Sequence, residues 1–415
     1  MDGNKCIKNC LFEKRMSALY KIKSDSLFTF LALVLFVVVM IKAPMIYHYF
    51  GEEFPLWYRL LIVGGVTMNG LILFTYGTVK VFRSKFKNLT NLFPLLLIYI
   101  LLIFIISIVF LNSAVVVTEL NVLNQTAIFQ YVIFFSLGLF LDKIFEYKKT
   151  LTLLYWVIVL FWLLNVNEFF LLDLTQNGIK DNSYLIYSDY FAILALVVAY
   201  MKRNSIWLIV YVLVSIVVIY TLNSRSAFVF LTFVLLLFGY LMNNKFYKYS
   251  FFFLFVALVY LVYLYIDLDM LQHMRMFSIF FGVDADVDGS AQARQHLMEI
   301  NLKDIKNNWL IGNYGGQYEM FGLSGAYIHN VLSFWRQFGL FTFIGILGLL
   351  GILCMRAFLI VKNRDENGYL LVLFTIYVVL GVMLSKSYVY PTLWFLFGFY
   401  VYKQIQEKAV LKCGF

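Results

Sequence analysis

Four residues that can bind anions or move protons share one long polar stretch of this otherwise apolar chain. Arg275, Arg294, His329 and Arg336 lie between an apolar run that ends near residue 266 and another that starts near residue 338. Guanidinium groups form bidentate, charge-assisted hydrogen bonds to phosphate and stay charged at neutral pH. Histidine, with an ordinary pKa of about 6.5, can accept a proton from a hydroxyl near neutral pH. We therefore expect chemistry on an anionic substrate in this stretch.

The elements that must position these residues are membrane-spanning helices. The chain has 415 residues, of which 62% are hydrophobic and 13% charged. A hydrocarbon core of about 30 Å requires about 20 apolar residues per helix, and about twelve such windows recur along the chain. They lie near residues 27–46, 58–79, 92–112, 124–142, 151–172, 184–200, 206–222, 226–242, 250–266, 338–358, 369–385 and 388–402.

The apolar windows predict an all-α, polytopic integral membrane bundle. Residues 31–40 and 95–110 are continuously apolar, whereas the strands of a membrane barrel would alternate polar and apolar residues. We find no internal repeat and no low-complexity linker, so residues 1–415 are expected to form a single membrane domain. Residues 267–337 form a large polar loop within it, between the ninth and tenth spans.

Lysine and arginine alternate between loops in a way that predicts the orientation of the bundle. The basic clusters fall in the N-terminal tail, in every second loop and at the C-terminus, which places both termini in the cytoplasm and the large loop in the periplasm. The net charge of +10 therefore orients the protein and does not indicate nucleic acid. The first span is expected to act as a retained signal anchor. The four cysteines, expected on or near the cytoplasmic side, are predicted to be free thiols: Cys6, Cys10, Cys354 and Cys413.

The large loop contains three recognisable segments. Residues 291–308 have helical spacing, with Leu297 and Ile305 in an apolar stripe, and predict an amphipathic helix on the membrane surface. Residues 309–316, with the sequence WLIGNYGG, contain glycines that permit a tight turn. On a helix His329 and Arg336 would then share one face with the serine between them, at positions i, i+4 and i+7.

Each candidate site residue also has a structural interpretation. Arg225 follows a short turn between two spans, so it either binds phosphate or extends to the interface, and we expect the former. His329 is the candidate base, although a histidine where a helix begins is more often a capping or interfacial residue. Asn330 either orients a sugar or caps the helix. Arg336 is a third phosphate ligand or an interface anchor, and Tyr314 stacks on a sugar ring or packs in the core.

Metal, nucleotide and hydrolase chemistry lack support in the sequence. Asp284, Asp286 and Asp288 have the spacing that opens a calcium loop, but the twelfth position is Gln295 where a bidentate glutamate is needed. The chain contains no HExxH zinc motif, no Walker phosphate loop and no nucleophilic serine elbow. We therefore expect no metal and no cofactor.

Three motifs in order, however, resemble a known family. Asn223-Ser224-Arg225 starts the eighth span, Arg294 lies in the loop helix, and the WLIGNYG turn leads to His329-Asn330. Over residues 221–345 this order is similar to that of the bacterial O-antigen polymerases of the Wzy type and the O-antigen ligases. The arginine spacings of some members do not match here, and the loop between the fifth and sixth spans contains no arginine.

The resemblance implies a metal-independent glycosyltransferase of the bacterial inner membrane with a GT-C-like architecture. Its donor and acceptor would be glycans linked to undecaprenyl diphosphate, with Arg225 and Arg294 on the diphosphate and His329 activating the acceptor. Asn330, Arg336, Arg275 and Tyr314 are the expected substrate-binding residues. Polymerases of the family usually work with a chain-length regulator and a flippase.

Three functions are compatible with these residues and with the family resemblance. We favour the polymerase, which joins repeat units for lipopolysaccharide. The alternative is the ligase, which transfers finished polymer to the lipid A core with the same donor chemistry. A polysaccharide flippase or transporter is a third reading, for which Asp189 is the only well-placed acid, and the absence of an internal repeat argues against it.

Overall fold

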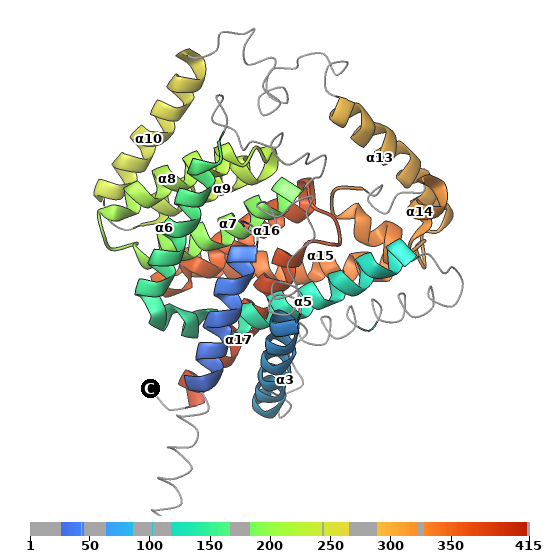
Figure 1. Ribbon diagram of the computed structural model, residues 1–415, viewed down its shortest axis with the longest axis horizontal. Coiled ribbons are helices and arrows are strands. Elements are labelled where there is room, and N and C mark those ends of the chain that lie inside the picture. The colour runs from blue at the N-terminus through green and yellow to red at the C-terminus, as the bar shows by residue number, and fades with distance from the viewer. Residues whose placement is uncertain are drawn as a thin grey trace, which may run out of the picture.

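The described part of the chain is built from helices. The computed structural model describes residues 26–42, 44, 64–85, 102, 118–166, 183–242, 245–264, 289–321 and 328–412. Every regular element within these ranges is helical, as predicted. After a first helix at Ser26–Lys42 come α3 (Val66–Lys85), α5 (Thr118–Ile144), α6 (Lys148–Leu164), α7 (Ser183–Met201), α8 (Trp207–Thr221), α9 (Arg225–Leu241), α10 (Lys245–Leu264), α13 (Gly289–Asn307), α14 (Gly316–Phe321), α15 (Leu332–Lys362), α16 (Tyr369–Leu384) and α17 (Pro391–Lys412) (Figure 1).

Helices overlap the predicted spans wherever the structure describes them, although α17 extends ten residues beyond the predicted end at 402. Three helical stretches are long and apolar enough to cross a membrane: Ala127–Leu164, Leu332–Lys362 and Glu366–Leu384. Shorter apolar helices include Trp207–Thr221 and Arg225–Leu241. The span predicted at 92–112 lies outside the described residues except for position 102. These helices identify a membrane protein, while the number of crossings and the topology stay predictions.

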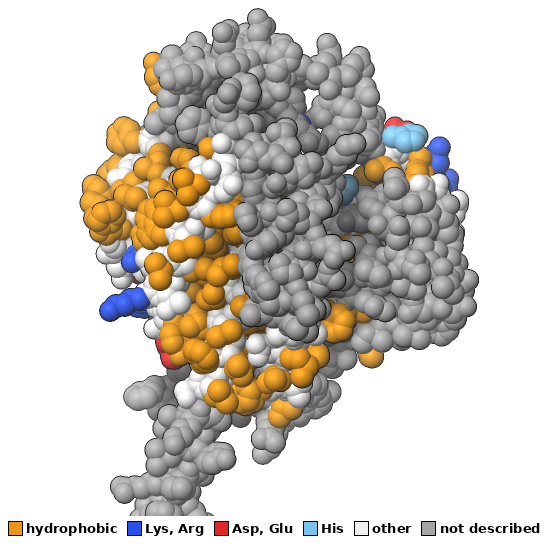
Figure 2. All heavy atoms as spheres, viewed as in Figure 1, with side chains coloured by type: hydrophobic (Ala, Val, Ile, Leu, Met, Phe, Trp, Pro, Cys, Tyr) orange, Lys and Arg blue, Asp and Glu red, His pale blue; other side chains and the backbone are white. Residues whose placement is uncertain are grey.

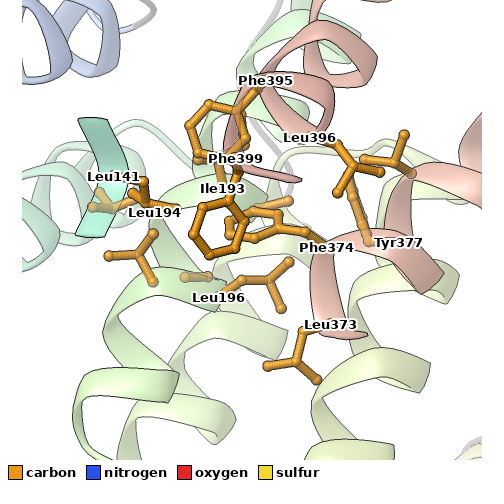
Figure 3. Packing of buried hydrophobic residues seen from close by; sticks show 14 of the residues in the cluster. Leu141, Ile193, Leu194, Leu196, Leu373, Phe374, Tyr377, Phe395, Leu396 and Phe399 are labelled. Carbon is orange, nitrogen blue, oxygen red and sulfur yellow. The ribbon is translucent and has the colours of Figure 1, made fainter. Parts of the chain in front are cut away.

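Helices α7 and α16 form the centre of the bundle. Residues 192–199 of α7 are all at most 1% exposed, and α16 is buried along most of its length. Because these side chains are also buried, other helices surround α7 and α16 on all sides. Figure 3 shows this packing, in which Ile193 of α7 lies among Phe374 of α16 and Phe395 and Phe399 of α17. The rings of Phe374 and Phe395 meet edge to face, with centroids 5.0 Å apart.

Helices α5 and α17 approach each other closely because each has a glycine at the crossing. A Cβ atom at Gly138 would overlap the carbonyl oxygen of Phe395, and one at Gly398 would overlap that of Phe135. Small residues at such crossings let two helix backbones pack tightly where lipid removes the usual hydrophobic driving force.

The outer surface of the bundle is apolar. On α6, Leu153, Val157, Leu160 and Leu164 lie on one face and are each at least 52% exposed. Figure 2 shows hydrophobic side chains over a broad area of the face that carries α6, α8 and α10. Large contiguous apolar surfaces are rare on soluble monomers, so lipid is the solvent that this face requires.

Polar contacts between helix ends lie at two opposite ends of the bundle. At one end the hydroxyl of Tyr200, near the end of α7, donates to the carbonyl oxygen of Asn367 at 3.1 Å. Lys403 of α17 pairs with Asp142 of α5 at 2.6 Å, near the same end. At the other end the backbone N–H of Tyr388, between α16 and α17, donates to Ser333 Oγ of α15 at 2.8 Å. Because the connections between α15, α16 and α17 lie at these two ends in turn, successive helices of the three run antiparallel.

We predict that Gly398→Ala destabilises the protein. The new methyl group would collide with backbone atoms of α5, which cannot move as a flexible side chain can, and overpacking of this kind costs about 1–3 kcal/mol or more. The measurement is the Tm of the purified protein in detergent.

Gly351→Ala on α15 is the matched control. Its Cβ atom would have no neighbour within 4 Å among the described residues. Alanine has the better helix propensity by about 1 kcal/mol, so this variant should be neutral or slightly stabilised. An equal Tm for both variants would contradict the close α5–α17 crossing.

Candidate functional site

The candidate site is organised by a buried ion pair between α13 and α15. Arg336 Nε lies 2.8 Å from Asp304 Oδ2, with the arginine side chain 0% and the aspartate 9% exposed. α13 is the amphipathic helix that the sequence predicts, but its inward face is not purely apolar. Ile305 and the fully buried Asn301 accompany Asp304 on that face, while Leu302 is exposed. The ion pair therefore attaches the loop helix to the membrane bundle.

The second carboxylate oxygen of Asp304 fixes the turn that follows α13. Asn308 Nδ2 and Asn313 Nδ2 donate to Asp304 Oδ1 at 2.9 and 3.0 Å. The backbone N–H of Asn313 also donates to the carbonyl oxygen of Arg336 at 2.7 Å. A buried charge is tolerated when it is paired and hydrogen-bonded, and both oxygens of this carboxylate are engaged.

Two glutamines extend the network into the next helix. Arg336 Nη1 and Gln337 Nε2 both donate to Gln317 Oε1 of α14, the second at 2.9 Å. Gln337 Oε1 in turn accepts the backbone N–H of Gly315 at 3.0 Å. All three side chains are at most 1% exposed. The segments on both sides of the 309–316 turn are thus held by the first turns of α15.

Glycines allow the 309–316 turn to lie directly on α15. Gly312 and Gly339 have φ angles of 84° and 81°, and a Cβ atom on either would collide with the other's backbone segment. The non-helical Gly339 divides α15 into a short first segment and a long apolar one. The N–H of Leu340, next to this kink, donates to the carbonyl oxygens of Trp309 and Leu310 at 3.1 and 3.2 Å. The tight glycine turn is confirmed.

His329 lies just before α15 and not on its helical face. The helix begins at Leu332, because Asn330 Oδ1 accepts the N–H of Leu332 at 2.9 Å and the carbonyl oxygen of Asn330 accepts that of Ser333. Asn330 therefore makes the capping interaction, one of its two proposed roles. His329 is partly exposed, and the polar network begins two helical turns further on. This position leaves the imidazole accessible from outside the bundle.

Tyr314 packs against aromatic rings beside the same network. Its ring centroid lies 5.2 Å from that of Phe338 and 6.3 Å from that of Tyr388. Burial raises the pKa of the Tyr314 hydroxyl, so it remains a protonated donor at neutral pH. The packing role holds in this structure, and sugar stacking stays a prediction.

The predicted arginines are distributed over several elements. Arg225 is the first residue of α9 and is partly buried, after a turn in which Asn223 adopts a positive φ of 53°. Arg294 belongs to α13, the helix that Asp304 holds against α15. Arg336 is inside the network, where phosphate would have to compete with Asp304. Arg275 and the acidic 284–288 segment lie outside the described residues.

Residues that sequence reasoning missed complete the picture. Asp304 could have been found from Asn301, Asp304 and Asn308, which recur at helical spacing on one face of the predicted 291–308 helix. Lys386 pairs with the buried Asp189 at 2.7 Å, although 197 residues separate them. No local sequence pattern predicts such a pair, because it forms only when α7 packs against α16.

Comparison with known proteins adds no relative: no family model matches the chain, and no curated protein matches it either. The function of this protein is therefore inferred from its own sequence and structure.

We predict that Arg336→Met releases α13 from the bundle. The change leaves the Asp304 carboxylate buried without its cation, at a cost of about 3–5 kcal/mol. Hydrogen exchange of the α13 amides should accelerate, as measured by mass spectrometry on the full chain.

The Arg336→Met/Asp304→Asn double variant is the control. It removes both charges and keeps an oxygen for Asn308 and Asn313, so most of the protection should return. Unchanged exchange in the single variant would show that the ion pair does not hold α13.

Proposed function

We propose that this protein is an O-antigen polymerase, a glycosyltransferase at the periplasmic face of the bacterial inner membrane. It would transfer a growing glycan from one undecaprenyl diphosphate to a lipid-linked repeat unit, in lipopolysaccharide biosynthesis. The proposal includes about twelve spans, both termini in the cytoplasm and the 267–337 loop in the periplasm. The order of Arg225, Arg294 and His329-Asn330 along the chain suggests this family.

The observation that carries the proposal is the rigid attachment of His329 and the Arg294 helix to one framework. His329 lies ahead of the first turns of α15, and Arg336 of those turns is paired with Asp304 of α13. α13 also contains Arg294. A base and an anion-binding residue can act on one substrate only if their elements keep a fixed relation, which this buried pair provides.

The reaction needs a base and anion stabilisation, and both fit the residue types present. The acceptor hydroxyl oxygen attacks the anomeric carbon of the donor, forming the new glycosidic bond as the bond to diphosphate breaks. His329 takes the hydroxyl proton, and the bond electrons leave with the diphosphate. Arg225 and Arg294 would stabilise that developing charge, a role that requires neither metal nor nucleotide.

The ligase uses the same donor chemistry, so the choice between the two depends on the acceptor. A chain-length regulator and a flippase are proposed as partners of the polymerase. An effect on chain length separates the two enzymes, because a ligase joins finished chains and does not extend them.

We predict that His329→Ala abolishes polymerisation. Without a base the hydroxyl proton has no acceptor, and loss of general base catalysis lowers rates by about 10²–10⁴-fold. In a deletion strain complemented with this variant, a lipopolysaccharide gel should show lipid A core bearing one repeat unit. Loss of every O-antigen band would indicate the ligase or flippase instead.

His296→Ala is the matched control for this experiment. His296 lies on α13 and is exposed, without a place in the network described above. Its substitution should leave the banded ladder of the wild type. A normal ladder from His329→Ala would contradict the assignment of the base.

We also predict that Arg225→Lys shortens the polymer. Lysine keeps the charge but loses the planar pair of donors, and a loss of about 1.4 kcal/mol already lowers the rate tenfold. The readout is chain-length distribution on the same gel at equal protein levels. Arg203→Lys, at the opposite end of the bundle near Asn367, is the control and should be silent. Equal effects of the two changes would remove Arg225 from the site.

A further inference from the structure

A second polar centre lies within the bundle, at the end that carries Ser333. Asp189 of α7 is 7% exposed and binds Lys386 Nζ through Oδ2 at 2.7 Å. Its other oxygen, Oδ1, accepts the hydroxyl of Tyr377 of α16 at 3.1 Å. Asp189 lies about 9 Å along α7 from its first residue, at about 1.5 Å per residue. The pair is therefore placed among apolar helices.

Stability alone does not account for this pair. Taking two charges out of water costs several kcal/mol per ion, and a well-packed apolar pair often stabilises a protein equally well. Ionisable groups within membrane-spanning segments generally mark sites of function. The Lys386–Asp189 pair therefore indicates a site at which one of the two charges binds a ligand or takes part in a reaction.

The ammonium group of Lys386 has capacity for an anion. It carries three donors, and among the described residues one of them is used, in the bond to Asp189. Its Nζ lies 5.5 Å from the ring centroid of Tyr390, in a cation–π contact. The Lys386 side chain is 12% exposed, so the described residues do not enclose it completely. The ammonium therefore keeps donors with which it could bind an oxyanion.

The surroundings of Lys386 favour an anion that is attached to a lipid. Met383 and Leu384, at the end of α16, are 40% and 64% exposed. They present apolar surface directly next to the cation in the chain. A phosphate bound to Lys386 would leave its hydrocarbon chain along these side chains, whereas a soluble anion gains nothing from them.

The turn between α16 and α17 connects this centre with the candidate site. Tyr388 donates its N–H to Ser333 Oγ, and its carbonyl oxygen accepts the Tyr131 hydroxyl at 2.8 Å. Ser333 lies in the first turn of α15, four residues after His329. An anion on Lys386 would therefore be held by the same segment that supports the start of α15.

We propose that Lys386, positioned by Asp189 and by the ring of Tyr390, forms a binding site for the phosphate group of a lipid-linked substrate. The ammonium exchanges part of its contact with Asp189 for phosphate oxygen, and no covalent bond changes. The identity of the lipid rests on the proposed function, but the phosphate site itself does not.

The test measures binding without turnover. The purified full chain in detergent is titrated with farnesyl diphosphate, a short polyprenyl diphosphate without sugar, and binding is followed by calorimetry. Asp189→Asn frees the ammonium from its competing carboxylate and should tighten binding about tenfold, or about 1.4 kcal/mol. Asp189→Asn/Lys386→Met removes both charges and should weaken binding at least tenfold relative to the wild type. Lys386→Arg keeps the cation and should still bind.

Opposite effects of the single and double variants distinguish a ligand site from a structural pair. The matched control is Asp142→Asn/Lys403→Met, which removes the ion pair at the other end of the bundle and should leave binding unchanged. Wild-type affinity in both Asp189→Asn and Asp189→Asn/Lys386→Met would overturn the proposal. If Asp189→Asn lowers the Tm too far for titration, the comparison of the double variant with Lys386→Arg decides alone.

Competition experiments identify the source of the phosphate. Inorganic diphosphate should compete weakly, and nanodiscs with phosphatidylglycerol should compete less than farnesyl diphosphate. Equal competition by inorganic diphosphate would overturn the lipid-linked part of the proposal. Charge-dependent farnesyl diphosphate binding in a protein whose deletion leaves O-antigen unchanged would reject the proposed polymerase and keep this site.

Discussion

The architecture of the candidate site depends on one buried ion pair, Asp304 with Arg336. The pair lies where a polar loop helix meets a helix of the membrane bundle, and it is completed by Asn308, Asn313 and Gln317. Buried pairs contribute little net stability, but removing one partner is costly, so they select a single arrangement over alternatives. α13 has few apolar side chains with which to dock, and its position must therefore be specified by polar contacts.

Glycine makes this polar docking sterically possible. Residues 309–312 lie against the kink at Gly339, where the backbone leaves the helical conformation and accepts no side chain. The kink also separates the polar first turns of α15 from its long apolar segment. One interruption of the helix thus provides both a site for the turn and the boundary between the polar and apolar parts of the element.

Two polar centres share the end of the bundle that carries Ser333. Arg336 contacts Asp304 of α13 and Gln317 of α14, whereas Lys386 contacts Asp189 of α7, which also binds Tyr377 of α16. The segment between α16 and α17 contacts both, through Tyr388 and Lys386. If substrate phosphate binds near either centre, this segment is the element that would transmit the effect to the other.

Apolar runs predicted the helices well, because a lipid environment demands long uninterrupted apolar segments and leaves few alternatives. The helix at Gly289–Asn307 and the glycine turn after it were also predictable from local spacing and from glycine's freedom at positive φ. The start of α15 was not, since Asn330 caps the helix and the first helical residue is Leu332, three residues after His329. Lys386 and Gln317 were missed because their roles depend on partners distant in the chain.

The most direct test of the central claim is polymerisation by the purified protein in nanodiscs, supplied with a synthetic repeat unit on undecaprenyl diphosphate. We predict a ladder of longer lipid-linked glycans without added nucleotide sugar and in the presence of a metal chelator, and no ladder from His329→Ala. A wild-type protein that folds, as judged by its Tm, and binds the substrate but yields only the single repeat unit would contradict the account.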